Sequence, residues 1–309
     1  MDVTLHIGAH RSGTTTLQKF LRANRSVLDD HNIAYWGPER TRSGLFSGLF
    51  KHPARVTRDS LRRARRSTGL IQIELERFER AGMTELIVSE ENMLGGLLEN
   101  IEKCRLYPNA GDRLSRFRRG FAGRNLRIAL SIRSYDSYWA SAFGYSVMRG
   151  YDVPDARVLD QMVTQPRRWR SVITALSEVF PEAELIVWPF EAFAGLPEMQ
   201  LAMLSRAGEV SGLRHRRCWL NASPTCDKLR EVLVDRGSDP DQINGEHGRW
   251  KPFRADHIMA LRGQYGHDLD WLRSGAAANV TFFPDVRTHE QRVRDERGRD
   301  YGDIERQMG

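Results

Sequence analysis

Four short apolar segments stand out along a chain that is otherwise largely polar. They are Val3–Ile7, Glu85–Val88, Leu126–Ile132 and Glu184–Trp188, and each is followed by a segment with helical character. Short apolar runs of this kind are typical of strands buried on both faces, and strands that alternate with helices are typical of a parallel sheet. The pattern therefore predicts a three-layer α/β/α fold with a central, mainly parallel sheet.

Two helices can be located from the spacing of their apolar residues. In the first, apolar positions within 17–21 recur at intervals of three and four, which predicts a helix from Thr14 to about Ala23. The second keeps helical spacing over 172–179, ahead of Pro181. Both helices directly adjoin predicted strands, so they belong to the layers that cover the sheet.

Two regions interrupt this pattern. The first, at about 40–80, is basic and turn-rich and then helical, and the second, at about 205–248, has little periodicity. We interpret both as helical insertions in a single domain, and no internal repeat is visible. Residues 287–309 are highly charged and nearly free of apolar side chains, which predicts a peripheral tail. The sequence thus predicts one domain over 1–286, followed by a charged tail.

Composition narrows the classes of protein that fit. The hydrophobic content of 40% is enough for a substantial core, and no run of about 18 apolar residues predicts a membrane span. The N-terminal residues do not resemble a secretory signal. Three cysteines, Cys104, Cys218 and Cys226, show no metal-type spacing, which favours reduced thiols. We therefore expect a cytoplasmic protein.

The charge of the chain is compatible with an anionic ligand. The formal net charge is +7, and arginine supplies nearly all of the cations. Arginine makes planar, bidentate contacts with phosphate and sulfate, although clusters such as 62–66 and 214–217 fit solvated surfaces equally well. Because no aromatic residues are interleaved with a basic motif, no nucleic-acid partner is expected.

The segment between the first strand and the first helix carries the most informative motif. A strand that enters a tight glycine turn and then a helix points backbone N–H groups and the positive helix end at one anion. Gly8 and Gly13 permit the turn, and Arg11 adds a full charge. The candidate anion-binding residues are Arg11, Ser12, Gly13, Thr14, Thr15 and Thr16.

The same loop has the glycine spacing of a nucleotide-binding G-x-x-x-x-G-K-[ST] motif without its lysine. Thr14 stands at the lysine position, and the nearest cation is Arg11. In a kinase that lysine neutralises the β- and γ-phosphates together with Mg²⁺. A sulfuryl group carries less charge than a phosphoryl group, so its transfer needs less neutralisation and no obligatory metal. The absence of the lysine therefore favours a sulfate donor.

His10-Arg11-Ser12-Gly13-Thr14-Thr15 resembles the 5′-phosphosulfate loop of the sulfotransferase superfamily, whose pattern is [K/R]-[S/T]-G-T-[T/S]. The resemblance implies a P-loop-type fold and 3′-phosphoadenosine-5′-phosphosulfate (PAPS) as co-substrate, with adenosine 3′,5′-bisphosphate as product. The matched segments cover less than half of the chain.

A second marker of that family is an arginine that ends a strand, with a serine eight residues later, which together hold the donor's 3′-phosphate. Arg133 and Ser141 match it. An arginine at the carboxyl end of a strand also overhangs the crevice in which open α/β sheets bind ligands. A weaker likeness lies at 248–252, which is similar to a donor-closing K-G-R-x-x-P loop; His247 replaces its lysine, and Arg249 is a candidate contact to the 3′-phosphate.

Sulfuryl transfer needs a base that takes the proton of the acceptor. The second apolar run ends in Ser89-Glu90-Glu91-Asn92, and the family places its base near the end of this strand. By position Glu90 is the first choice and Glu91 the second. The expected mechanism is in-line transfer, in which Arg11 and the loop amides stabilise the leaving phosphate.

Two other functions fit parts of the pattern. A P-loop kinase or NTPase would use the carboxylates after 86–89 to hold Mg²⁺, and a non-catalytic nucleotide-binding protein could keep all donor contacts without turnover. The acceptor itself is not identified by any motif; a glycan, a lipid head group and a small molecule all remain open. The oligomeric state is open as well.

Overall fold

The structure is a computed structural model that describes residues 1–207, 210–214 and 223–288. Its centre is a six-stranded sheet in which every neighbouring pair of strands is parallel, in the order β2-β3-β1-β4-β5-β6. The strands are β1 Asp2–His6, β2 Ile33–Trp36, β3 Glu85–Ser89, β4 Asn125–Ile132, β5 Glu184–Pro189 and β6 Val280–Phe282.

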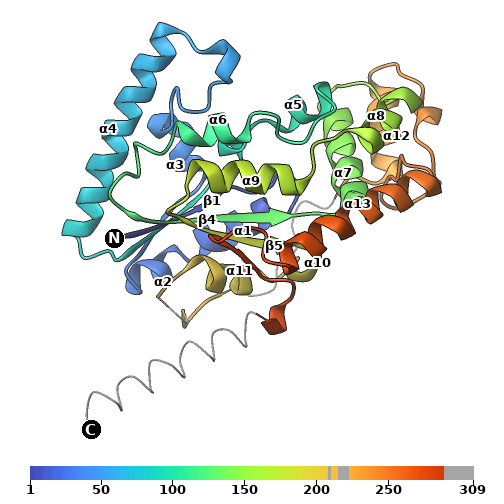
Figure 1. Cartoon of the computed structure of the whole chain (residues 1–309). Helices are drawn as coiled ribbons and strands as arrows, with labels where there is room; N and C mark the ends of the chain where they lie inside the picture. The colour runs from blue at the N-terminus through green and yellow to red at the C-terminus, as the bar shows by residue number, and fades with distance from the viewer. Residues whose placement is uncertain (208–209, 215–222, 289–309) are drawn as a thin grey trace.

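Helices cover both faces of this sheet (Figure 1). One layer contains α1 Thr14–Ala23, α2 Arg25–Asp30, α10 Phe190–Phe193 and α11 Pro197–Leu204. The opposite layer contains α4 Arg58–Arg80, α5 Leu97–Glu102, α6 Ala110–Ser115, α7 Tyr135–Met148, α9 Trp169–Val179, α12 Cys226–Asp235 and α13 Ala255–Arg273. The remaining short elements are α3 Pro38–Arg40, η1 Thr41–Leu45, η2 Pro53–Arg55, η3 Glu91–Met93, α8 Ala156–Thr164 and η4 Pro240–Gln242. The predicted three-layer α/β/α fold is confirmed.

The alternation of side chains along each strand explains the two layers. In β3, Leu86 and Val88 pack with the core under α4 and α9, whereas Ile87 packs with the core under α1. Both sets are fully buried, because successive side chains of a strand point to opposite faces of the sheet. This two-sided burial is the reason why each strand appears in the sequence as a continuous apolar run.

The predicted secondary structure is largely confirmed, with two strands missed. The four predicted strands are present, each end within one residue of the prediction, and the helix Thr14–Ala23 has the predicted bounds. The first insertion is helical, as α4 shows. The sequence did not reveal β2 or β6, which have four and three residues and no clear flanking signals. Of the second insertion only part is described, including α12, and the tail beyond 288 lies outside the described residues.

The order of the strands creates a crevice beside β1. After β1 the chain moves to β2 and β3 on one side, and β4 and β5 then follow on the other side. Such a reversal of direction leaves a gap between the loops at the carboxyl ends of the strands, where open α/β sheets bind ligands. The loops after β1, β3, β4 and β5 therefore share one edge of the sheet.

Candidate functional site

The loop after β1 is held tightly against its neighbours. Its backbone continues the β1–β4 pairing beyond the strand, because the Ala9 N–H donates to the Ser131 carbonyl at 2.9 Å and the Ser131 N–H donates to Gly8. Gly8 and Gly13 have φ of 101° and 83°, in the region that favours glycine. A Cβ on Gly8 would lie 3.0 Å from the Cβ of Glu91, so a larger residue has no room there.

Gly13 ends the loop as the N-cap of α1, and Phe190 covers it. A Cβ on Gly13 would lie 3.2 Å from the Phe190 ring, so the loop and the end of β5 are in close contact. Because α1 begins at Thr14, its first N–H groups and the positive end of its dipole face the loop that precedes the helix. The predicted succession of a strand, a tight turn and a helix is therefore present.

A pocket opens along the second half of this loop. Its lining brings together residues from separate segments of the sequence: Arg11, Gly13, Thr14, Thr15, Thr16, Arg133, Ser141, Phe190, Ala194, Gly195, Gln200, Ser223 and Arg249. Eight of these were candidates from the sequence alone. Ser12 is the exception, since its buried hydroxyl donates to the Ala9 carbonyl at 2.6 Å and is not part of the lining. We call this cavity the anion pocket.

Serine and arginine side chains connect the walls of the anion pocket. Arg11 Nε donates to Ser141 Oγ at 2.9 Å, and Ser223 Oγ donates to the same oxygen at 2.8 Å. Arg133 donates to the Arg11 carbonyl, and its guanidinium lies 4.7 Å from the centroid of the Phe190 ring. Two arginines that are far apart in the sequence are thereby fixed at one place.

Burial of these arginines is electrostatically unfavourable without an anion. Burial, together with the charges of Arg11 and Arg249, lowers the pKa of Arg133 to about 10, although Glu191 acts in the opposite direction. Burial likewise lowers the pKa of Arg11. A bound phosphate or sulfate would relieve both the desolvation and the repulsion between like charges. The pocket is thus suited to a ligand with strong negative charge.

A second cavity adjoins the anion pocket and shares four of its residues, Arg133, Ser141, Ser223 and Arg249. Its further lining includes Trp250, Lys251, Phe253 and Arg262. The 248–252 segment is held there by an antiparallel bridge between Thr225 and Arg249. His247, by contrast, is 84% exposed and lies 3.6 Å from Asp227. The structure therefore brings Arg249, but not the residue at the lysine position of the likeness, to the arginine pair.

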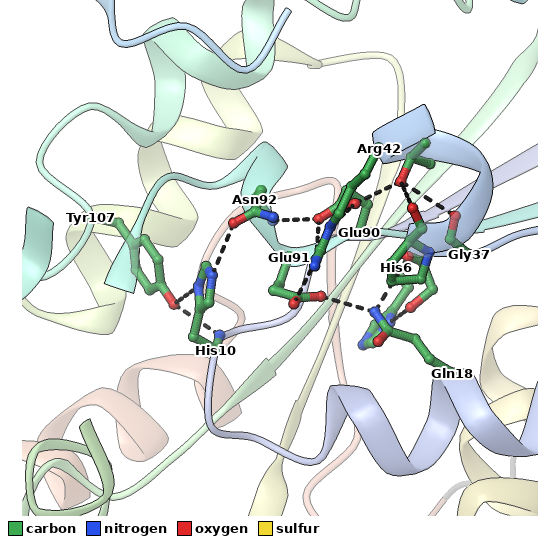
Figure 2. Close-up of polar contacts among 12 residues, drawn as sticks. His6, His10, Gln18, Gly37, Arg42, Glu90, Glu91, Asn92 and Tyr107 are labelled. Atoms are coloured by element: carbon green, nitrogen blue, oxygen red, sulfur yellow. Dashed lines mark hydrogen bonds and ion pairs between the residues drawn. The ribbon is translucent and has the colours of Figure 1, made fainter. Parts of the chain in front are cut away.

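Glu90 and Glu91 lie at the end of β3, on the side of Gly8, and neither lines the anion pocket. Figure 2 shows that one guanidinium, that of Arg42 in η1, reaches both carboxylates. Arg42 donates to both oxygens of Glu90, at 2.9 and 2.8 Å, and its Nη2 lies 2.9 Å from Glu91 Oε1. The hydrogen bonds with Glu90 raise the pKa of Arg42.

Glu90 has no acceptor capacity left for a substrate. Its side chain is fully buried, and besides Arg42 it accepts from Thr41 Oγ1 at 2.6 Å and from the Asn92 N–H at 3.1 Å. Four donors occupy the roughly four lone-pair positions of a carboxylate. This arrangement is typical of a structural carboxylate.

Glu91 differs from Glu90 in both exposure and bonding. Its side chain is 15% exposed, and its Oε1 accepts from Arg42 Nη2 while its Oε2 accepts from Gln18 Nε2 at 2.8 Å. Although burial by itself raises the pKa of Glu91, the charges of His10 and Arg42 and the hydrogen bond from Gln18 lower it overall. Glu91 is therefore ionised at neutral pH, and its carboxylate is less completely occupied by donors than that of Glu90.

His10 and His6 complete the polar network beside the loop. His10 Nδ1 lies 3.0 Å from the Tyr107 hydroxyl, and its Nε2 lies 3.4 Å from Asn92 Oδ1 (Figure 2). Burial lowers the pKa of His10, and it lowers the pKa of His6 to about 4. Burial thus favours the neutral form of both imidazoles at pH 7, and the charge of His10 that lowers the pKa of Glu91 is present only at lower pH.

Sequence reasoning missed several residues of the site. Arg42 belongs to an insertion and has no motif, and Phe190 and Ser223 reach the pocket only through the three-dimensional path of the chain. For Phe190 a signal existed, because it lies two residues after a predicted strand whose carboxyl end had to lie at the crevice. No comparable signal pointed to Arg42 or Ser223.

Comparisons with protein-family models, with curated proteins and with solved structures gave no match for this chain. Within the described residues, no group of three or more His, Cys, Asp or Glu side chains is arranged to hold a metal ion. In the same part of the chain, no helix has the length and apolar character needed to cross a membrane.

Proposed function

We propose that this protein is a sulfotransferase that moves a sulfuryl group from PAPS to a hydroxyl or amine of an acceptor and releases adenosine 3′,5′-bisphosphate. The observation that carries the proposal is the convergence of Arg11, Arg133, Ser141 and Arg249 on one pocket at the N-terminus of α1. A single phosphate would not need cations from so many segments. A ligand with phosphate groups at two positions of one nucleoside would need cations at two places and would account for these residues.

The geometry supports separate binding sites for the two phosphate-bearing ends of the donor. Arg11 and the loop amides would hold the 5′-phosphosulfate at the helix end, whereas Arg133, Ser141 and Arg249 would hold the 3′-phosphate. The adjoining cavity lies beside the same arginines and would hold the nucleoside. This division agrees with the family resemblance of the loop and of the Arg133/Ser141 pair.

The same geometry favours Glu91 over Glu90 as the base. Glu91 would take the proton from the acceptor while the acceptor oxygen or nitrogen forms its bond to sulfur. The bond between sulfur and the bridging oxygen of the 5′-phosphate would break in the same step. Arg11 and the loop N–H groups would stabilise the negative charge that develops on the leaving phosphate. Arg42 would act as a positioning residue that fixes both carboxylates.

Arg133→Ala tests the donor site. We expect the dissociation constant for adenosine 3′,5′-bisphosphate to rise between about 10- and 150-fold, because hydrogen bonds to a charged group contribute about 1.5–3 kcal/mol. Calorimetric titration measures the change. Arg273→Ala, which removes a half-exposed arginine at the end of α13, is the matched control and should bind like the wild type. Equal affinities of all three proteins would show that Arg133 does not hold the ligand.

A further inference from the structure

A buried carboxylate, that of Asp268, lies at the junction of three helices near the anion pocket. Asp268 belongs to α13, which packs against α7 and α9 (Figure 1). The residue is 4% exposed and lines neither the anion pocket nor the adjoining cavity. An effect of Asp268 on a ligand in either cavity therefore has to pass through other residues.

Asp268 binds two aromatic residues that begin the other two helices. Its Oδ2 accepts from the hydroxyl of Tyr135, the first residue of α7. The same oxygen accepts from the backbone N–H of Trp169, the first residue of α9, at 3.1 Å. The two rings are stacked, with centroids 6.2 Å apart and 11° between their planes. One carboxylate oxygen thus connects both members of the aromatic pair.

The aromatic pair in turn holds the backbone of Arg133. Trp169 Nε1 donates to the Arg133 carbonyl at 2.8 Å, and Tyr135 lies two residues after Arg133, where the turn after β4 enters α7. The side chain of Arg133 then donates to the Arg11 carbonyl in the wall of the anion pocket. A series of direct contacts thus leads from Asp268 through Trp169 to Arg133.

The same turn has a second support from α13. The Ser134 N–H donates to Glu191 Oε1 at 2.9 Å, and the Tyr265 hydroxyl donates to Glu191 Oε2 at 3.1 Å. Tyr265 precedes Asp268 by three residues, so both side chains lie on one face of α13. The turn that begins with Arg133 is therefore held from α13 at two places.

Asp268 also binds the N-terminus of α9. Its carboxylate accepts from the backbone N–H groups of Trp169 and Arg170, where negative charge is favourable. Burial raises the pKa of Asp268, although these hydrogen bonds act in the opposite direction. Removal of the carboxylate will therefore lower the stability of the fold. An experiment on Asp268 has to separate this loss of stability from a change in the position of Arg133.

We propose that Asp268 is a positioning residue of the donor site, which holds Arg133 in place for the 3′-phosphate and thereby sets the preference for a 3′-phosphorylated nucleotide. The contacts of Asp268 are those of the structure, whereas the role of Arg133 toward the 3′-phosphate rests on the proposed function. A small displacement of the guanidinium weakens its bonds to a phosphate, since charge-assisted hydrogen bonds require short distances and good alignment.

Asp268→Asn tests the proposal, with the dissociation constants of adenosine 3′,5′-bisphosphate and AMP measured by calorimetric titration of the full chain. Asparagine keeps the size of the side chain but replaces one acceptor atom with a donor. The affinity for the bisphosphate should fall about 5- to 30-fold. The affinity for AMP, which has no 3′-phosphate, should change less than about twofold. In an Arg133→Ala background the same substitution should change neither affinity, because its effect passes through Arg133.

Two further variants complete the test. Trp169→Phe removes the indole N–H that reaches the Arg133 carbonyl and keeps the backbone N–H that binds Asp268. It should show the same selective loss, and it carries the test if Asp268→Asn does not fold. Ser177→Ala is the matched control, since it removes a hydroxyl on the same helix that donates to Asn279 and lines neither cavity. Its preference for the bisphosphate should equal that of the wild type.

Two outcomes would show that Asp268 only stabilises the fold and would overturn the proposal. The first is an equal loss of affinity for both nucleotides, and the second is a full effect of Asp268→Asn in the Arg133→Ala background. The wild type separates these outcomes from a failure of the proposed function. A wild type that does not bind the bisphosphate would contradict the sulfotransferase and the positioning role together. Wild-type binding with an unchanged preference in Asp268→Asn would contradict the positioning role alone.

Discussion

Replacing Glu91 with glutamine should slow sulfuryl transfer at least about a hundredfold, while the affinity for adenosine 3′,5′-bisphosphate stays unchanged. Loss of a general base typically lowers the rate by about 10²–10⁴-fold. Glutamine keeps the size of the side chain, and Glu91 does not line the anion pocket, so donor binding should not depend on it. The rate is measured as turnover of PAPS with an acceptor, and the affinity by calorimetry.

The pH dependence of the reaction provides a second check on Glu91. Its pKa is lowered in the folded protein, so the carboxylate is ionised throughout the neutral range. As the pH falls, kcat/KM should therefore decrease only below the usual range of glutamate, when the carboxylate takes up a proton. A decrease centred within or above the usual range of glutamate would contradict Glu91 as the base. Full activity of Glu91→Gln would exclude Glu91.

Replacing Glu90 with glutamine should lower the free energy of unfolding by about 3 kcal/mol. The fully buried Glu90 carboxylate is bonded to both Arg42 and Thr41, and breaking a buried ion pair is strongly destabilising. Urea denaturation at pH 7 measures the change. Because Arg42 itself is 44% exposed, we expect the lower end of the range known for buried pairs.

Glu76→Gln is the matched control for this stability change. Glu76 lies 3.2 Å from Arg80 on α4, and both side chains are largely exposed. Exposed pairs contribute between about 0.2 and 1 kcal/mol, so the control should unfold almost like the wild type. A Glu90→Gln protein that is as stable as the control, yet has lost turnover, would make Glu90 the base instead of Glu91.

The parts of the site that follow one another in the sequence could be predicted from it. The loop from Arg11 to Thr16 is a strand, a turn and a helix in direct succession, so local patterns define it. Arg133 and Ser141 could be predicted because a strand end fixes the first, and the following helix carries the second. In both cases the location of the residues in space follows from a general rule, because ligands of open parallel sheets bind at the carboxyl ends of the strands.

The relation between Glu90 and Glu91 could not be predicted in this way. Position along the strand favoured Glu90, but the placement of η1 decides which carboxylate is saturated, and η1 lies almost fifty residues earlier in the chain. β2 and β6 were missed for a related reason. They are short, and their burial depends on neighbouring strands rather than on a pattern within them. Both the saturation of Glu90 and the two short strands thus depend on contacts between residues far apart in the sequence, which local patterns do not contain.

Calorimetric titration of the purified protein with adenosine 3′,5′-bisphosphate, ADP and ATP in the presence of EDTA tests the central claim most directly. The proposed donor site predicts tight binding of the bisphosphate and weak binding of ADP and ATP, since only the bisphosphate carries a 3′-phosphate for Arg133 and Ser141. Absence of bisphosphate binding, together with ATP binding that appears when Mg²⁺ is restored, would contradict the sulfotransferase and favour a P-loop kinase or NTPase.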